Sequence, residues 1–253
     1  YFNNISVDMM FGLPNQKVEI LKNDLEEVIN NLGKNGKLKH ISVYSLILEK
    51  GTKFWNNSKI EKMLPSEDEE RDMYKAAQKI LNENGYIQYE ISNFAKKGYE
   101  SKHNVNCWKQ MEYYGFGIGA SSYYNNIRYT NIRGIYKYIE KYLENIDKKD
   151  YKNSNEEKKR FLIKLNEDKI QNEYILKKSM EYIYKNYNIL EIQKAEDKLR
   201  EKIIIGLRME KGIYLEKEMI ENFEINKVID KYIKLKFLKK YIGEGRERIY
   251  LLN

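Results

Sequence analysis

The stretch NISVDMMFGLPNQ, residues 4–16, combines an alternating apolar pattern with a strong turn signal. Apolar side chains at every second position have the period of a strand with one buried face. The FGLPNQ that follows carries Gly and Pro, which end regular strands. Asn15, in this turn, tolerates a left-handed backbone better than most residues other than glycine. We therefore expect a strand over 4–10 and a tight turn directly after it.

A helix and a second strand follow this turn at the interval of a βαβ unit. Apolar residues recur at helical spacing over 17–32, and Gly33 and Gly36 end the pattern. HISVYSLIL, residues 40–48, reads as a strand, which His40 is expected only to open. Strand, helix and strand at this interval are typical of parallel pairing, so the sequence predicts a parallel, barrel-like sheet.

The next segments continue the alternation of helix and strand. A helix begins after Pro65, where Ser66 and Glu69 have the spacing of a capping box. YIQYEI, residues 86–91, reads as a strand, and residues 92–114 read as a polar loop. The stretch GFGIGASSYY that comes next is expected to be a strand. Its three glycines at every second position would leave one face without side chains.

The last part of the chain reads as a separate small domain. Residues 135–205 contain neither Gly nor Pro, and we expect helices there. Helices are predicted over 195–208, 215–223 and 226–237, and a hairpin that turns at Gly243 follows them. Three helices followed by a β-hairpin are typical of a winged helix. The sequence thus predicts an α/β fold with a second, winged-helix-like domain.

Composition and charge restrict the class of protein. The chain has 253 residues, of which 42% are hydrophobic, and this is typical of a folded protein. Its single cysteine, Cys107, leaves no internal disulfide and fits a reducing cytoplasm. No apolar run is long enough to predict a membrane span. The net charge of +8 comes from lysines spread through the whole chain, so nucleic acid is not the expected partner.

Asp8 is the first candidate for a functional side chain. It alternates with Val7 and Met9, so we expect it on the face that points into a barrel, away from the helices. Ligands of parallel α/β sheets bind at the carboxyl ends of the strands. A carboxylate buried there needs a partner, such as a ribose diol or a cationic group. A structural role, in which Asp8 caps a loop or pairs with an internal lysine, explains the residue equally well.

Six motifs within residues 3–133 resemble one protein family, in the family's order and approximate spacing. They are DMMFGLPNQ (8–16), HISVYSLILEKGT (40–52), PSEDEERDMY (65–74), YEISNFAKKGYESKHN (89–104), YYGFGIGASSY (113–123) and RYTN (128–131). They are similar to the radical S-adenosylmethionine family of oxygen-independent coproporphyrinogen III oxidase (HemN)-like proteins, and especially to its HemW haem-chaperone branch.

The resemblance implies a division of the chain into three parts. Residues 1–146 would be the C-terminal part of a radical-SAM partial TIM barrel, an α/β fold. Residues 147–194 would be a helical, low-complexity connection, longer than the family's usual one. Residues 195–253 would form the family's winged-helix-like C-terminal domain.

An S-adenosylmethionine pocket in the barrel is also implied by the resemblance. The aspartate of the family's D-hydrophobic-GLP strand contacts this cofactor, and Asp8 stands at that position. Five further residues would border the cofactor, at the end of the second strand and along the glycine-rich segment: Leu46, Ile47, Gly117, Gly119 and Ser121. Ser121 stands where the family usually has a histidine, and Asn15 stands where it usually has a glycine.

The segment SKHNVNCW, residues 101–108, contains the second candidate, His103. A neutral imidazole beside aromatic residues ligates haem iron, although a lone histidine in a loop is more often an ordinary surface residue. The segment resembles the HNxxYW motif of the HemW branch, which is associated with haem binding, and this implies that His103 contacts haem. Cys107 stands where the family has Tyr. It is either a harmless replacement, which we favour, or a second iron ligand.

A single cysteine excludes the family's iron–sulfur cluster from this chain. The family holds a [4Fe–4S] cluster on three cysteines in CxxxCxxC, and nothing here corresponds to that motif. We expect S-adenosylmethionine and the cluster in the full-length protein, with haem as a further ligand, and none of the three stably bound to this chain. The chain is accordingly expected to be a C-terminal fragment that lacks the first part of its barrel.

The function implied is that of a cytoplasmic haem chaperone, which binds and delivers haem. The alternative is an oxygen-independent coproporphyrinogen III oxidase, which decarboxylates its substrate with a radical from S-adenosylmethionine; KHNVNCW favours the chaperone branch. Whether the whole protein is an enzyme stays open, and this chain alone is expected to be inactive. Expected partners are haem or a porphyrin, the missing half of the barrel, and further copies of the chain through the unpaired edge of strand 4–10. Neither a membrane nor nucleic acid is expected.

Overall fold

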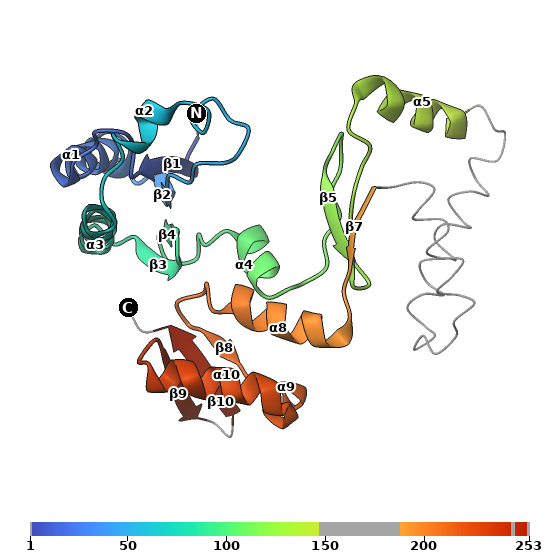
Figure 1. Cartoon of the computed structure of the whole chain (residues 1–253). Helices are drawn as coiled ribbons and strands as arrows, with labels where there is room; N and C mark the ends of the chain where they lie inside the picture. Colours follow the sequence, from blue (N-terminus) through green and yellow to red (C-terminus); the bar gives the residue numbers. More distant parts are fainter. Residues whose placement is uncertain (1, 147–187, 244–245, 252–253) are drawn as a thin grey trace. The chain divides into compact units, whose positions relative to one another are not determined.

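The computed structural model describes residues 2–146, 188–243 and 246–251 (Figure 1). The chain divides into two compact units. The first unit consists of residues 1–109 and 202–253, and the second of residues 110–201. The predicted limits of the three parts, at 146 and 194, stay a prediction. Most of the predicted connection 147–194 lies outside the described residues, but its last residues include a strand that the sequence analysis did not predict.

The first unit begins with the predicted βαβ arrangement. Strand β1 (Ile5–Phe11) pairs in parallel with β2 (Leu38–Ser45), and helix α1 (Val18–Val28) connects them. A short π-helix, η1 (Ile29–Gly33), continues α1. Asn15 has a φ of 60°, so the left-handed turn expected after β1 is confirmed.

The sheet of the first unit is not wholly parallel, which corrects the sequence prediction. Helix α3 (Glu67–Glu83), which follows the short helix α2 (Ser58–Glu61), leads into β3 (Ile87–Glu90). The chain then reverses into β4 (Asn93–Ala95), which lies between β2 and β3 and is antiparallel to both. The order β1-β2-β4-β3 makes an open mixed sheet. The described strands therefore give the predicted α/β class without a closed barrel.

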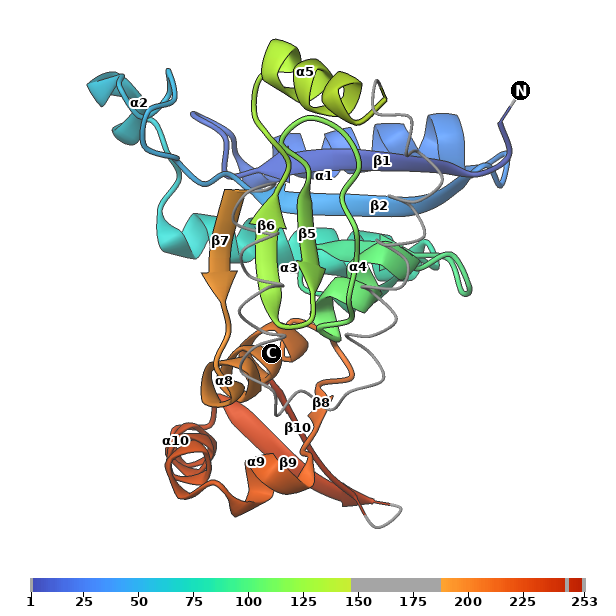
Figure 2. The same cartoon turned by 90° about the vertical axis from the view of Figure 1, so that its right-hand side faces the viewer.

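Helices α1 and α3 cover one face of this sheet, as Figure 2 shows. The capping box predicted at the start of α3 is present, because Ser66 and Glu69 exchange side-chain and backbone hydrogen bonds. The core between the helices and the sheet consists of fully buried side chains: Leu21, Leu25, Leu38, Ile41, Met73, Ala77, Leu81 and Phe94. Burial of this apolar surface is what orders the unit.

Helix α4 (Lys102–Trp108) occupies part of the segment that was expected to be a loop. Ser101 caps it, since its hydroxyl accepts a hydrogen bond from the backbone N–H of Asn104 at 3.3 Å. The loop prediction for residues 92–114 is therefore wrong both here and at β4. Both elements are short, and periodicity gives little signal over so few residues.

The second unit contains a three-stranded antiparallel sheet. Its order is β5 (Ser121–Tyr124), β6 (Ile127–Thr130) and β7 (Asn188–Ile192), and Figure 2 shows the three as labelled arrows. Helix α5 (Ile135–Ile146) follows β6. The glycine-rich segment before Ser121 is not a strand, because two of its glycines have positive φ.

The C-terminal elements follow the predicted winged-helix order. Helices α8 (Ala195–Gly206), α9 (Lys217–Glu221) and α10 (Phe223–Lys234) precede the hairpin of β9 (Leu238–Gly243) and β10 (Arg246–Leu251). A two-residue strand, β8 (Ile213–Tyr214), completes a sheet of order β8-β10-β9. Among the described residues, no helix combines the length and apolar character that crossing a membrane requires.

The core of the first unit makes a stability prediction. Leu25 has no exposed surface, whereas Leu32, one turn beyond α1, is 36% exposed. Leu25→Ala should lower the free energy of unfolding by about 2–5 kcal/mol, because it removes buried methyl groups and leaves a cavity. Leu32→Ala, the matched control, should change it by about 0.5 kcal/mol or less. Urea unfolding followed by circular dichroism measures both, and equal losses would contradict the assigned core.

Candidate functional site

The face of the sheet opposite α1 and α3, here called the polar face, carries a row of polar side chains. Asp8 pairs in register with Ser42, Ser42 with Asn93, and Asn93 with Glu90. Paired residues on neighbouring strands point to the same face. Asp8 is exposed, whereas Ser42, Asn93 and Glu90 are 3%, 2% and 0% exposed. The row therefore runs from an accessible carboxylate on the edge strand to a fully buried carboxylate at the other edge.

Asp8 lies where the alternation of residues placed it. The side chains on either side of Asp8 pack against the core, so Asp8 points to the polar face. They are Ile5, Val7 and Met9. This confirms its predicted orientation relative to the helices. Its predicted role as a cofactor contact is not tested by this geometry.

Leu46 and Ile47 follow β2 directly, at the carboxyl end of the sheet. The backbone N–H of Leu46 donates to the carbonyl oxygen of Phe11 at 2.9 Å, so the ends of β1 and β2 stay together. Both side chains line an open hollow of about 410 Å³, together with residues from the loop after β2, including Phe54. Ile47 is 77% exposed. Asp8 is not among the residues that line this hollow.

The other three predicted cofactor residues belong to the second unit. Gly117 and Gly119 have φ values of 101° and 66°, so they lie in a loop where only glycine is unstrained. The side-chain amide of Asn131 holds this loop by donating to the carbonyl oxygens of Gly115 and Gly117, at 3.1 and 2.8 Å. Ser121 is exposed at the start of β5. The bare strand face expected from the glycine spacing does not exist.

His40 is buried, and it was expected only to open a strand. Its Nδ1 lies 2.9 Å from the Ser6 hydroxyl, and its Nε2 lies 2.8 Å from the Tyr89 hydroxyl. The Tyr89 oxygen also accepts a hydrogen bond from the backbone N–H of Ser101 at 3.2 Å. Neutral His40 with its proton on Nδ1 satisfies both contacts, since Tyr89 then donates to Nε2 and the Nδ1–H donates to Ser6. This chain of hydrogen bonds joins β1 and β2 to the N-terminus of α4.

Burial determines the protonation states of the two ionisable side chains in this series of hydrogen bonds, His40 and Tyr89. It lowers the pKa of His40 below its usual value, and the nearby carboxylates of Asp8 and Glu90 oppose this shift without cancelling it. Burial also raises the pKa of Tyr89 to about 12. Both side chains are therefore neutral at neutral pH.

Helix α4 presents His103 and Cys107 one turn apart. His103 is exposed, and its Nε2 lies 3.7 Å from the Cys107 sulfur. Burial raises the pKa of the Cys107 thiol, which favours the protonated form and weakens it as a ligand. In the described part of the chain, no three His, Cys, Asp or Glu side chains are grouped in a way that could hold a metal ion.

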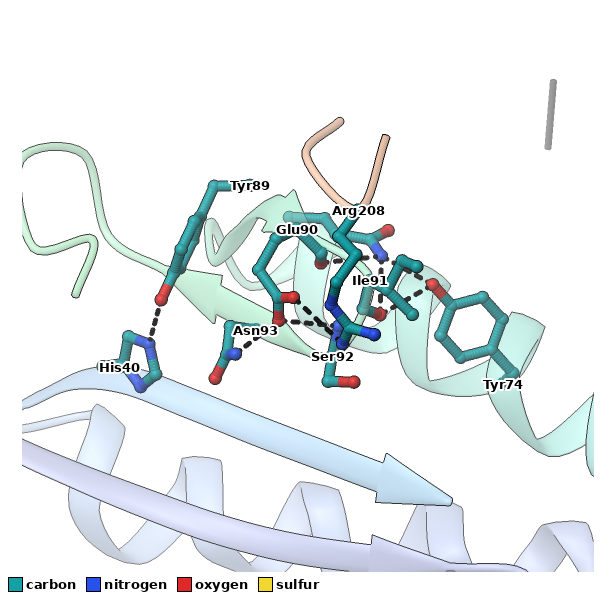
Figure 3. Close-up of polar contacts among 9 residues, drawn as sticks. His40, Tyr74, Tyr89, Glu90, Ile91, Ser92, Asn93 and Arg208 are labelled. Carbon is teal, nitrogen blue, oxygen red and sulfur yellow. Dashed lines mark hydrogen bonds and ion pairs between the residues drawn. The ribbon is translucent and has the colours of Figure 1, made fainter. Parts of the chain in front are cut away.

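Sequence reasoning missed the cluster around Glu90, shown in Figure 3. The Glu90 carboxylate accepts hydrogen bonds from the backbone N–H of Ser92 at 2.8 Å and from the Asn93 side-chain amide. The Arg208 guanidinium lies 3.4 Å from it, and the same guanidinium lies 4.4 Å from the centre of the Trp108 ring. The only sequence signal was an acidic residue inside an otherwise strand-like stretch.

Comparisons with known proteins agree with the motifs. No family model matches the chain. It is 45% identical over 139 residues to the haem chaperone HemW of Lactococcus lactis subsp. lactis (strain IL1403), which covers 54% of this chain and 35% of that protein. It is 40% identical over 140 residues to HemW of Bacillus subtilis (strain 168), which covers 55% and 36%. The match thus spans about a third of the length of these curated relatives.

One solved structure shares the fold. The chain matches coproporphyrinogen III oxidase (HemN) from Escherichia coli, a radical SAM enzyme, with a TM-score of 0.56 and 15% identity, over 97% of this chain and 50% of that one. The likeness shows a shared fold, and the described part of this chain is of the α/β class. The sequence identities confirm the predicted resemblance to the HemN-like family and favour its HemW branch.

The buried His40 predicts a pH dependence of stability. The unfolded chain takes up a proton at this histidine near pH 6.5, and the folded chain does so only at lower pH, because the folded pKa is lowered. The free energy of unfolding should therefore fall as the pH drops below about 6.5, by at most about 1.4 kcal/mol per pH unit.

Substitution of each histidine tests this assignment. His40→Gln should remove the dependence between pH 8 and 5.5, where most carboxylates stay ionised. His103→Ala, which changes the chain's other histidine, should retain it. The assignment of the effect to His40 fails if His40→Gln keeps the full dependence in urea unfolding at several pH values.

Proposed function

We propose that the protein is part of a haem chaperone of the HemW type, which binds haem and delivers it, and that His103 is its haem contact. The observation that carries the proposal is an exposed imidazole on an ordered helix, in a segment that resembles the HemW haem-binding motif. The names of two similar curated relatives support it. Neutral imidazole is a common axial ligand of haem iron.

Cys107 is the competing ligand on the same helix. Its raised pKa means that the thiol keeps its proton near neutral pH, and iron binds the thiolate rather than the thiol. The proposal therefore assigns haem contact to His103 and treats Cys107 as a harmless replacement of the family's Tyr.

The proposal includes S-adenosylmethionine and a [4Fe–4S] cluster in the full-length protein. A cluster does not fit the residues present, because the chain has one cysteine and the described side chains offer no three-ligand group. The accessible Asp8 carboxylate fits hydrogen bonding to a ribose diol, and the apolar side chains of Leu46 and Ile47 fit contact with a flat ring. We assign no reaction step to this chain.

Location and partners complete the proposal. A cytoplasmic location is supported by a single cysteine in 253 residues. Haem or a porphyrin is the proposed ligand. The outer edge of β1, on the side away from β2, pairs with no other described strand. This edge is the proposed contact for the rest of the barrel or for a second copy of the chain. The oxidase alternative has support from the shared fold alone, because the matched oxidase structure is 15% identical.

A haem titration followed by visible absorption tests the proposal. The unchanged chain should give a saturable shift of the Soret band, and His103→Ala should lose it because the iron loses its imidazole. Lys102→Ala, on the same helix, and Cys107→Ser are the matched controls, and both should bind like the unchanged chain. Equal binding by His103→Ala would remove His103 from the site, and no binding by any variant would refute a haem site in this chain.

Reconstitution with iron and sulfide gives an independent prediction. One cysteine cannot supply the three thiolates of a radical-SAM cluster. We expect no stable visible absorption of an iron–sulfur cluster after desalting, and no difference between the unchanged chain and Cys107→Ser. A cluster that survives desalting and disappears in Cys107→Ser would contradict the proposal.

A further inference from the structure

The segment that follows α8 attaches to the outer edge of β3. The backbone N–H of Ile91 donates to the carbonyl oxygen of Arg208 at 3.0 Å, and the N–H of Glu210 donates to the carbonyl oxygen of Tyr89 at 3.1 Å. Met209 forms an isolated antiparallel bridge with Glu90 between them. The residues around Arg208 therefore act as a short additional strand. This strand fixes the backbone position from which the Arg208 side chain extends.

The ion pair with Glu90 positions the guanidinium group at the end of the Arg208 side chain. Glu90 is fully buried, and a buried carboxylate is strongly unfavourable without compensation. Hydrogen bonds from Ser92 and Asn93 compensate one carboxylate oxygen, and the Arg208 guanidinium approaches the other. Arg208 and Glu90 thus constrain each other's positions.

The Arg208 guanidinium carbon lies over the ring of Trp108, the last residue of α4, at 4.4 Å from the ring centre. The Trp108 Nε1–H and the Arg208 Nε–H are both buried and have no hydrogen-bond acceptor among the described residues. The contact is therefore a cation–π interaction rather than a hydrogen bond. A lysine in place of Arg208 would lose the planar, weakly hydrated guanidinium that favours this contact.

Both ends of α4 are thereby tied to adjacent residues of β3. At its N-terminus, the Ser101 N–H donates to the Tyr89 hydroxyl, which also contacts buried His40. At its C-terminus, Trp108 is held through Arg208 by Glu90. A helix of seven residues is not stable by itself, so its orientation depends on these two attachments.

We propose that Arg208 is a positioning residue for haem binding, which it supports by holding α4 so that His103 presents its imidazole in one orientation. This inference rests on the proposed function, because it assumes that His103 contacts haem. It makes the segment after α8 necessary for full haem affinity, although Arg208 itself touches no ligand. Removing a group that orients a metal ligand typically weakens metal binding about 10–100-fold.

The test uses the whole chain with Arg208→Lys, which leaves a cation for Glu90 but removes the guanidinium that lies over Trp108. The double variant Glu90→Gln/Arg208→Gln removes both charges, so that no buried carboxylate is left unpaired. Arg200→Gln is the matched control, because Arg200 lies on α8 and forms an exposed ion pair with Glu196. Circular dichroism establishes that each variant is folded.

The first readout needs no haem. Amide hydrogen exchange over residues 102–108 should become about tenfold faster or more in Arg208→Lys and in the double variant, because α4 loses its C-terminal attachment. Arg200→Gln should leave it unchanged. Unchanged exchange in both Arg208 variants overturns the inference, whatever haem does.

The second readout is haem binding. In the Arg208 variants, the dissociation constant should rise about tenfold or more, and the Soret band should change from a single form to a mixture of ligation states. Faster exchange with unaltered affinity and spectrum overturns the positioning role. Absence of binding by the unchanged chain refutes the proposed function and the haem role of Arg208 together, whereas the exchange result still shows whether Arg208 holds α4.

Discussion

A carboxylate without exposed surface lies at the reversal between β3 and β4, and much of the first unit is arranged around it. The Glu90 carboxylate is compensated by Ser92 in the turn, by Asn93 at the start of β4 and by the distant Arg208. The first two contacts favour a hairpin, which places β4 between β2 and β3. The third brings the segment after α8 to the sheet. The groups that compensate one buried charge thus come both from the local hairpin and from a distant segment.

The two edges of the sheet differ as a result. At the β3 edge, backbone hydrogen bonds from residues 208–210 satisfy groups that would otherwise face solvent. At the β1 edge, no other described strand pairs with the backbone, and a hollow of about 500 Å³ lies beside it between β1 and α1. Unpaired strand edges invite pairing with another chain. The sheet is thus closed on the side of its own C-terminal segment and open on the other.

The sequence predicted the features that depend on regular periodicity. It did not predict the features whose structure depends on individual tertiary contacts or backbone angles. Alternation around Asp8 gave its orientation, and the spacing of Ser66 and Glu69 gave the start of α3. Strand β4 was missed because three residues carry no period. The glycine-rich strand was wrong because spacing does not reveal that Gly117 and Gly119 adopt positive φ.

The candidate site shows the same limit. His103 could be identified from its motif, but not the helix that carries it, since α4 depends on tertiary attachments. Neither the burial of His40 nor its contact with Tyr89 had any local signal. The interaction of Arg208 with Glu90 joins residues 118 positions apart, and a local reading of sequence does not reach that distance.

That separation also has a consequence for the time at which the protein becomes complete during synthesis. Translation adds about 5–20 residues per second, so Arg208 is made roughly ten seconds after Glu90. Until it emerges from the ribosome, the Glu90 carboxylate lacks its cation and α4 lacks its second attachment. The residues of the N-terminal strands and helices are therefore synthesised before α4 can be fixed, and the Glu90–Arg208 contact forms only after the segment that follows α8 has been made.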